Sequence, residues 1–263
     1  MDVQLSGKTA FVSGSTQGIG YAIAEALLRE GASCVINGRD GDRVRASVAA
    51  LQATVPGADV SGTAADFTDP EQVADLVAQL GEVDILVNNV GLFEVAPFAE
   101  VSDEDWQRYF DVNVMSGVRL SRHLLPRMLD RGWGRILFVA SESGVNVPAD
   151  MVHYGATKAA MLALGNGLAK LTKGTAVTVN SILGGPTYSD GVAEAVTELS
   201  EAQRVPQAAL KEAIAAGNQT SLLQRFIEPA EIAHLATYLA SPLASATNGA
   251  AVRADGGVLT TVL

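Results

Sequence analysis

Short apolar runs alternate with longer amphipathic segments along most of the chain. The runs predict buried strands, and the segments with apolar residues every three or four positions predict helices. Strands that alternate with helices form a parallel sheet with helices on both faces and right-handed crossovers. The sequence therefore predicts an α/β fold with a doubly wound, seven-stranded parallel sheet. The strands are expected at residues 8–13, 33–37, 60–65, 84–87, 134–140, 175–183 and 250–253.

The helical pattern places one helix after almost every strand. No linker, repeat or low-complexity stretch interrupts the alternation, so the sequence predicts a single domain over residues 1–263. The exception is a long helix-prone segment at 184–226, which we expect to act as a lid because it follows the carboxyl end of a strand. Ser102, with Asp105 three residues later, is expected to cap one long helix. Helices are expected near 22–31, 40–54, 70–81, 102–129, 154–173, 192–199 and 207–216.

Charge and composition restrict the classes of partner. The chain has 263 residues, is 48% hydrophobic and carries a formal net charge of −11, which argues against nucleic acid or an anionic membrane as a partner. Its one cysteine, Cys34, lies in an apolar run and is expected to be a buried strand thiol. Neither a signal-like N-terminus nor an apolar run of membrane length is found, so we expect a soluble, cytoplasmic protein.

Three glycines follow the first predicted strand and open a helix. Gly14, Gly18 and Gly20 occupy the position of a dinucleotide-binding turn, where the backbone approaches a pyrophosphate and a helix N-terminus favours its charge. The spacing GxxxGxG differs from the more widespread GxGxxG. This turn predicts a Rossmann-type, dinucleotide-binding fold.

The end of the second strand indicates which dinucleotide binds. NAD sites usually place a carboxylate there to hold the ribose 2′-hydroxyl group. This chain instead has Arg39, with no carboxylate until Asp40, and Arg43 lies close by. A guanidinium pairs with a 2′-phosphate, which a carboxylate would repel. We therefore expect NADP(H) to be preferred, with NAD(H) still possible.

A hydroxyl, a phenol and an ammonium are expected to meet where the fifth strand ends. Ser141 follows that strand, and Tyr154 and Lys158 are four residues apart on one face of the next helix. A neighbouring cation favours phenolate, so Lys158 is expected to lower the pKa of Tyr154. The tyrosine could then exchange a proton with a carbonyl or alcohol oxygen that Ser141 positions by a hydrogen bond.

These motifs resemble those of the short-chain dehydrogenase/reductase family over nearly the whole length, and the chain is similar to its 3-oxoacyl-[acyl-carrier-protein] reductase group. The thirteen-residue step from serine to tyrosine also matches. The matching segments are Ser13–Gly20, Asp66, Asn88–Gly91, Asn113, Ser141, Tyr154 with Lys158, Gln224–Phe226, Glu228–Ile232 and Asp255–Gly257.

The resemblance implies a role for each matching residue. Tyr154 would be the general acid or base, Lys158 would hold the nicotinamide ribose, Ser141 would orient the substrate oxygen, and Asn113 would help to hold a proton-relaying water chain. Gly184-Gly185-Pro186-Thr187 departs from the usual Pro-Gly turn, and loss of the first proline is expected to loosen it. The implied cofactor-binding residues are Gly14, Ser15, Gln17, Gly18, Ile19, Gly20, Arg39, Asp66, Phe67, Asn88, Gly91, Tyr154, Lys158, Gly185 and Thr187.

Several functions agree with this pattern. The first is NADP(H)-dependent reduction of a ketone or aldehyde, or oxidation of the corresponding alcohol. The second is reduction of a 3-oxoacyl thioester, for which Arg119, Arg122, Arg127 and Arg131 are the nearest approach to a carrier-docking patch. A non-catalytic dinucleotide sensor is a third. The resemblance also implies a homodimer or homotetramer, and the three scattered histidines predict no metal site.

Overall fold

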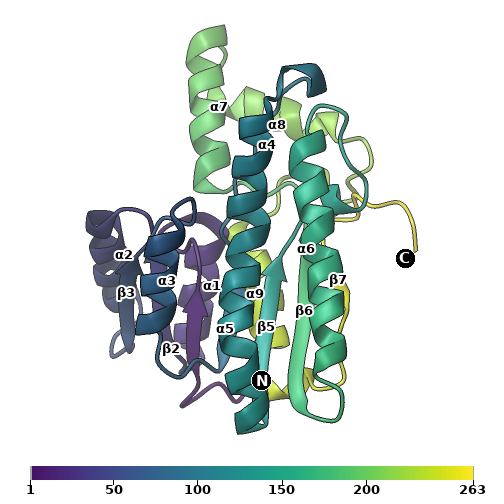
Figure 1. Cartoon of the computed structure of the whole chain (residues 1–263). Coiled ribbons are helices and arrows are strands. Elements are labelled where there is room, and N and C mark those ends of the chain that lie inside the picture. Colours follow the sequence, from purple (N-terminus) through teal and green to yellow (C-terminus); the bar gives the residue numbers. More distant parts are fainter. Residues whose placement is uncertain (1, 263) are drawn as a thin grey trace.

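Seven parallel strands form one sheet in the computed structural model, which describes residues 2–262 (Figure 1). Their order is β3-β2-β1-β4-β5-β6-β7, and all neighbouring pairs are parallel. The winding direction reverses between β1 and β4, which is where open sheets of this kind bind ligands. The strands are β1 (Thr9–Val12), β2 (Ser33–Gly38), β3 (Val60–Ala64), β4 (Ile85–Asn88), β5 (Trp133–Val139), β6 (Ala176–Gly184) and β7 (Ala251–Ala254).

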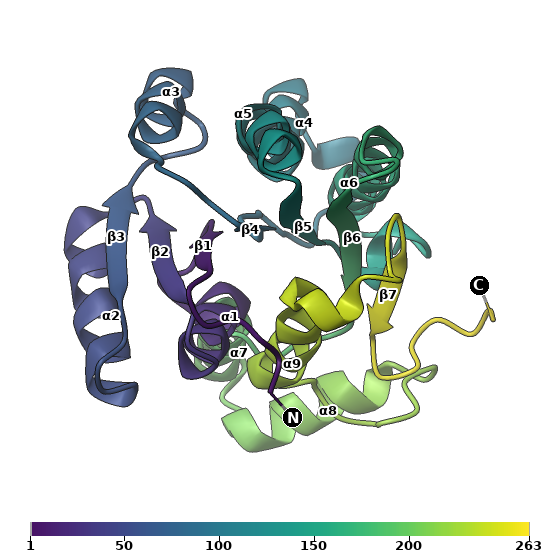
Figure 2. The same ribbon diagram turned by 90° about the horizontal axis from the view of Figure 1, so that it is seen from below.

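Helices cover both faces of this sheet, as the alternation predicts (Figure 2). One face carries α1 (Gly18–Arg29), α2 (Gly41–Thr54) and α9 (Pro229–Ala240). The other carries α3 (Pro70–Gln79), α4 (Asp103–Tyr109), α5 (Ser116–Arg131) and α6 (Val152–Leu171). Two apolar clusters fill the two interfaces between helices and sheet, and Cys34 is buried in one of them as expected. None of the described helices is long and apolar enough to cross a bilayer.

The long helix expected over 102–129 is present as one continuous helical stretch from Asp103 to Arg131, but its middle turn departs from α-helical geometry. It begins where expected, because the Ser102 hydroxyl accepts a hydrogen bond from the Asp105 amide. After α4, however, a π-helical turn over Phe110–Met115 interrupts the α-helical pattern before α5 begins. Helix α9 was also not predicted as an element, although Glu228 and Glu231 form its capping box.

Two helices occupy the segment expected to be a lid. They are α7 (Asp190–Gln203) and α8 (Gln207–Gly217), close to the ranges that the sequence predicts. Both stand beyond the carboxyl ends of the strands, at the top of Figure 1. The helical pair therefore stands at the end of the sheet that carries the predicted site, on the side of α1 and α9 (Figure 2).

Candidate active site

A groove made of three adjoining hollows runs along the carboxyl ends of the strands. The first hollow is lined by residues of the glycine-rich turn and of the segment after β2. The second shares Gly14, Gln17 and Gly91 with the first and reaches Tyr154 and Lys158. The third shares Tyr154 with the second and extends past Ser141 to the lid. The groove thus connects the predicted cofactor residues to the predicted catalytic residues.

Two asparagines hold the glycine-rich turn in shape. The buried Asn37 accepts a hydrogen bond from the Gly14 amide through Oδ1 (3.2 Å). Asn89 donates from Nδ2 to the carbonyls of Ser13 (3.0 Å) and Gly14 (2.8 Å). A Cβ on Gly20 would lie 2.4 Å from both the Gly14 carbonyl and the Asn89 amide, so only glycine fits there. Asn37 and Asn89 were not predicted as site residues, and only the NNVG motif signalled Asn89.

A carboxylate of the chain itself already occupies the N-terminus of α1. Asp190, the first residue of α7, accepts a hydrogen bond from the Gly18 amide through Oδ2 (2.5 Å). A helix N-terminus with free amides favours an anion, and the pyrophosphate of a dinucleotide has the same requirement. The Asp190 contact therefore shows that this turn fits an anionic group.

The first hollow is rich in guanidinium groups. Arg39, Arg43 and Arg108 all line it. Arg39 is exposed and has no ion-pair partner among the described residues. The Asp40 carboxylate instead caps α2, accepting hydrogen bonds from the amides of Asp42 and Arg43, and those bonds lower its pKa. Asp40 is thus committed to the helix, and Arg39 presents an unpaired positive charge to the groove.

The three predicted catalytic side chains do converge. Ser141 caps the short 3₁₀ turn after β5, while Tyr154 and Lys158 lie one turn apart on α6. A hydrogen bond joins Tyr154 to Ser141, and the Lys158 ammonium lies 5.6 Å from the centre of the Tyr154 ring. Lys158 is only 5% exposed, and its Nζ donates to the carbonyl of Val139 (2.9 Å).

The expected lowering of the tyrosine pKa is not found. Burial raises the pKa of Tyr154 to about 12, an effect that its hydrogen bond with Ser141 only partly opposes. Burial also lowers the pKa of Lys158 to about 8. The carboxylate of Glu142 raises both pKa values. Desolvation is the largest of these effects on Tyr154, and the protein residues alone keep the phenol neutral.

Asn113 lies in the π-helical turn, with its carboxamide fully engaged by protein groups. Its Oδ1 accepts from the Leu92 amide (2.7 Å), and its Nδ2 donates to the Leu92 carbonyl (3.0 Å) and to Thr157 Oγ1 (2.9 Å). Thr157 in turn donates to the carbonyl of Tyr154 (2.7 Å). Asn113 therefore connects the loop after β4 to α6. Its expected part in a water chain stays a prediction.

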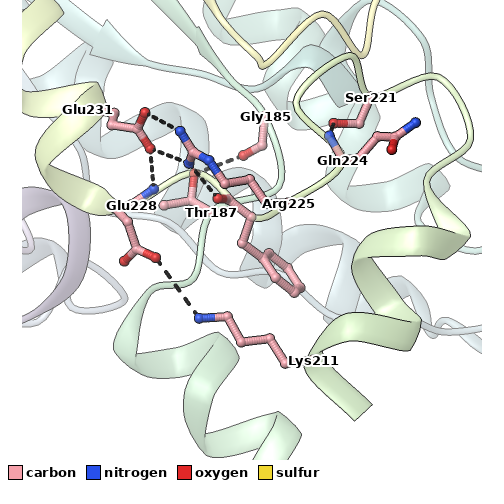
Figure 3. Close-up of polar contacts among 9 residues, drawn as sticks. Gly185, Thr187, Lys211, Ser221, Gln224, Arg225, Glu228 and Glu231 are labelled. Atoms are coloured by element: carbon pink, nitrogen blue, oxygen red, sulfur yellow. Dashed lines mark hydrogen bonds and ion pairs between the residues drawn. The ribbon is translucent and has the colours of Figure 1, made fainter. Parts of the chain in front are cut away.

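The Gly184–Thr187 segment forms the floor of the third hollow. Gly184 is the last residue of β6 and lies in register with Ala254 of β7, so the sheet holds the backbone that a proline would otherwise restrain. Thr187 Oγ1 donates to the carbonyl of Gly185 (2.8 Å), as Figure 3 shows. Gly185 and Thr187 thus lie where the sequence predicts, at the lid end of the groove.

A second polar cluster anchors the chain where the lid rejoins the sheet. In Figure 3 the Arg225 guanidinium pairs with both carboxylate oxygens of Glu231 (2.7 and 2.8 Å), which lowers the pKa of Glu231 to about 2. Lys211 of α8 lies 3.9 Å from Glu228 Oε1 and stacks over the ring of Tyr188 (3.6 Å). These contacts tie α8 to the start of α9.

Four predicted site residues do not line the groove. Asn113 is described above, and Ser15 and Gly20 support the turn from within. The Asn88 side chain points toward α5, where Nδ2 donates to Ser121 Oγ (3.4 Å), so the neighbouring Asn89 lines the groove in its place. The predicted residues that do line it are Gly14, Gln17, Gly18, Ile19, Arg39, Asp66, Phe67, Gly91, Ser141, Tyr154, Lys158, Gly185 and Thr187.

Comparison with known proteins agrees with this geometry. The family model described as "short chain dehydrogenase" matches residues 8–200. The chain is 44% identical to the uncharacterized oxidoreductase YvrD of Bacillus subtilis (98% of this chain, 99% of the relative). It is 31% identical to the 3-oxoacyl-[acyl-carrier-protein] reductase FabG of Aquifex aeolicus (98% and 100%). L-sorbose reductase from Gluconobacter frateurii, solved with NADPH and L-sorbose, superposes with a TM-score of 0.93 at 34% identity and full coverage of both chains.

Proposed function

The chain belongs to the short-chain dehydrogenase/reductase family and is an oxidoreductase acting on CH–OH and C=O groups, and from this premise we propose that it is an NADP(H)-dependent reductase of a ketone or aldehyde. In the reverse direction it would oxidise the corresponding alcohol. The observation that carries the proposal is the convergence of Ser141, Tyr154 and Lys158 on one continuous groove.

Each catalytic side chain has a role in the proposed reaction. When bound, the nicotinamide supplies or accepts the hydride. Tyr154 gives its phenolic proton to the carbonyl oxygen in reduction and takes a proton from the alcohol in oxidation. The Ser141 hydroxyl, which donates to Glu142 in the structure, would turn toward that oxygen and hold it by a hydrogen bond. Lys158, one helical turn from Tyr154, supplies the positive charge that favours the phenolate when the tyrosine loses its proton.

The preference for NADP(H) is supported by the charges of the first hollow. Arg39 presents an unpaired guanidinium, and the one nearby carboxylate of the β2–α2 segment, Asp40, is held by the α2 amides. A phosphate on the ribose would bind more tightly to such a site than a hydroxyl group would. The relative solved with NADPH agrees with this choice. NAD(H) remains the alternative.

The proposal is tested by following oxidation of NADPH and NADH with a panel of ketones, aldehydes and acyl thioesters, with alcohols tested in reverse. We expect one chemical class to be reduced with a preference for NADPH. Tyr154→Phe should abolish turnover and leave NADPH affinity nearly unchanged. Tight NADPH binding with no turnover of any carbonyl compound would instead favour the dinucleotide sensor.

Acyl-thioester reduction is the second candidate, and likeness to FabG supports it. The arginines that could dock an acyl carrier are partly engaged on α5, however. Arg127 donates to the carbonyl of Leu80, and Arg131 donates to that of Val83 and lies 3.8 Å from Asp84. We therefore rank small carbonyl compounds ahead of carrier-bound thioesters. A homodimer or homotetramer and a cytoplasmic location stay predictions.

A further inference from the structure

Glu142 lies beside the catalytic serine and lines the third hollow. We propose that Glu142 sets the substrate class of this reductase: it favours an uncharged carbonyl compound with a hydroxyl group next to the carbonyl, and it rejects carboxylate substrates. This inference rests on the proposed function and adds to it the chemistry of the substrate.

One oxygen of the Glu142 carboxylate is already in use. Oε2 accepts hydrogen bonds from the Ser141 hydroxyl and from the Ser143 amide (2.8 Å). These bonds fix the carboxylate against the turn that carries the catalytic serine. No donor among residues 2–262 reaches the other oxygen, Oε1. The side chain is partly exposed, so Oε1 remains available to a hydrogen-bond donor on a bound molecule.

The rest of the third hollow provides no positive charge to balance Glu142. Its described lining contains no lysine, arginine or histidine. The other residues that line this hollow are apolar or neutral, among them Phe93, Met151 and Val192. Lys158 lines the adjoining hollow instead, where its ammonium donates to the carbonyl of Val139. An anionic group that entered the third hollow would therefore meet an uncompensated negative charge.

The charge of Glu142 also acts on the two titratable side chains of the proposed reaction. It raises the pKa of both Tyr154 and Lys158, so its field extends across the space that the substrate oxygen would occupy. A carboxylate next to the reacting carbonyl would be repelled there. A hydroxyl group would instead donate to the carboxylate, and hydrogen bonds to a charged acceptor are the stronger kind.

The charge of the substrate is tested with the matched pair acetoacetate and methyl acetoacetate, and with Glu142→Gln, which removes the charge and keeps the shape. For the native enzyme we expect kcat/KM to favour the ester by about 10- to 100-fold. In Glu142→Gln this ratio should fall about tenfold or more, mainly because the anion is reduced faster. Glu198→Gln, which removes the same charge from the exposed face of α7, should leave the ratio unchanged. A native preference for acetoacetate, or an unaltered ratio in Glu142→Gln, would overturn the proposal.

The hydroxyl group is tested with 1-hydroxypropan-2-one and butan-2-one, which have similar size. Glu142→Ala removes the acceptor, and the preference for the hydroxyketone should then fall about tenfold or more. An equal preference in native and variant enzyme would contradict this part of the inference.

Binding separates a failure of this inference from a failure of the proposed function. Two variants are compared, Tyr154→Phe and the double variant Tyr154→Phe/Glu142→Gln, because neither should turn over substrate. Quenching of the fluorescence of bound NADPH gives the Kd of acetoacetate and of its methyl ester in each variant. If the native enzyme reduces no carbonyl compound, the proposed function fails, while a Kd ratio that responds to Glu142 still supports the assignment. If turnover is found and the Kd ratio is the same with and without Glu142→Gln, only the role assigned to Glu142 fails.

Discussion

The carboxylate of Asp190 accepts a 2.5 Å hydrogen bond from the backbone amide of Gly18, so the first residue of the lid helix α7 contacts the first residue of α1. The two residues are 172 positions apart in the chain. The contact fastens α7 to the glycine-rich turn and puts a negative charge on the amide that a pyrophosphate would use. A dinucleotide bound at this turn would therefore compete with Asp190 for the same donor.

Replacement of Asp190 by alanine should tighten cofactor binding. The carboxylate no longer occupies the Gly18 amide, and its charge no longer repels the pyrophosphate. We expect the Kd of NADPH to fall about 2- to 5-fold, the range typical of a charge at a helix N-terminus, with a larger change at low salt. Fluorescence titration measures it, and Glu194→Ala, on the exposed side of the same helix, is the control. Weaker binding in Asp190→Ala would mean that Asp190 helps to hold the cofactor.

Arg39→Ala should reduce the preference for NADPH over NADH. The guanidinium is exposed and unpaired within the described chain, so its loss should cost little stability. Loss of a charge-assisted contact to a phosphate should lower kcat/KM for NADPH about 10- to 100-fold and leave the value for NADH nearly unchanged. Arg45→Ala, whose guanidinium pairs with Asp42 outside the groove, is the matched control. An equal loss with both cofactors would assign Arg39 a general rather than a phosphate-specific role.

Local patterns were sufficient to predict the sheet and most helices. Apolar runs and capping residues such as Ser102 are signals confined to a few neighbouring residues, and the strands appeared within one or two residues of their expected ends. The π-helical turn has no such local signal. Asn113 is held there by the main chain of Leu92, a contact that depends on tertiary structure. Propensity could therefore predict a helix but not its interruption.

In the candidate site, too, local sequence patterns predict some features, and contacts between distant parts of the chain are missed. Ser141, Tyr154 and Lys158 were predicted because a motif fixes their spacing, and the structure brings them together. The direction of the Tyr154 pKa was predicted wrongly, because a sequence shows the neighbouring lysine but not the amount of burial. The contact of Asp190 with Gly18 was not predicted, since nothing local connects the lid to the turn.

Lys158→Met should remove activity without loss of stability. Lys158 is buried with one hydrogen bond, and burial lowers its pKa from the ordinary 10.5 to about 8. Below pH 8 the buried ammonium therefore lowers the free energy of unfolding of the native protein. We expect the variant's free energy of unfolding at pH 7 to equal the native value or to exceed it by about 1–3 kcal/mol. Turnover should fall at least about a hundredfold.

The pH dependence of the free energy of unfolding shows whether the buried charge of Lys158 causes the difference between the variant and the native protein. Between pH 8 and 10.5 the unfolded chain holds a proton that the folded lysine has lost, so native stability should rise with pH in this window. The methionine variant has no lysine to titrate, so its free energy of unfolding should not rise in this way. The difference between variant and native protein should therefore vanish by about pH 10.5. Urea unfolding at several pH values measures both curves. A constant difference at all pH values would show that packing, rather than charge, is responsible.

Arg135→Ala should destabilise the fold strongly. Arg135 is 1% exposed on β5, and it donates to the carbonyls of Gly134, Ala176 and Ser241. Its guanidinium also lies 4.6 Å from the centre of the Trp133 ring. Truncation leaves buried carbonyls without donors and opens a cavity, so we expect a loss of about 2–4 kcal/mol in the free energy of unfolding. Arg29→Ala, which breaks only the exposed pair with Glu25, should cost less than about 1 kcal/mol.

Glu142→Gln should move the pH profile of alcohol oxidation to lower pH. The negative charge of Glu142 raises the pKa of both Tyr154 and Lys158, so its removal lowers both values. Oxidation requires Tyr154 to accept a proton from the alcohol, and its rate should therefore rise with pH as these groups lose their protons. The rising limb of kcat/KM against pH should appear at lower pH in the variant, whereas Glu198→Gln should follow the native curve. An unmoved limb in Glu142→Gln would mean that the carboxylate acts on substrate binding alone and does not tune the proton transfer.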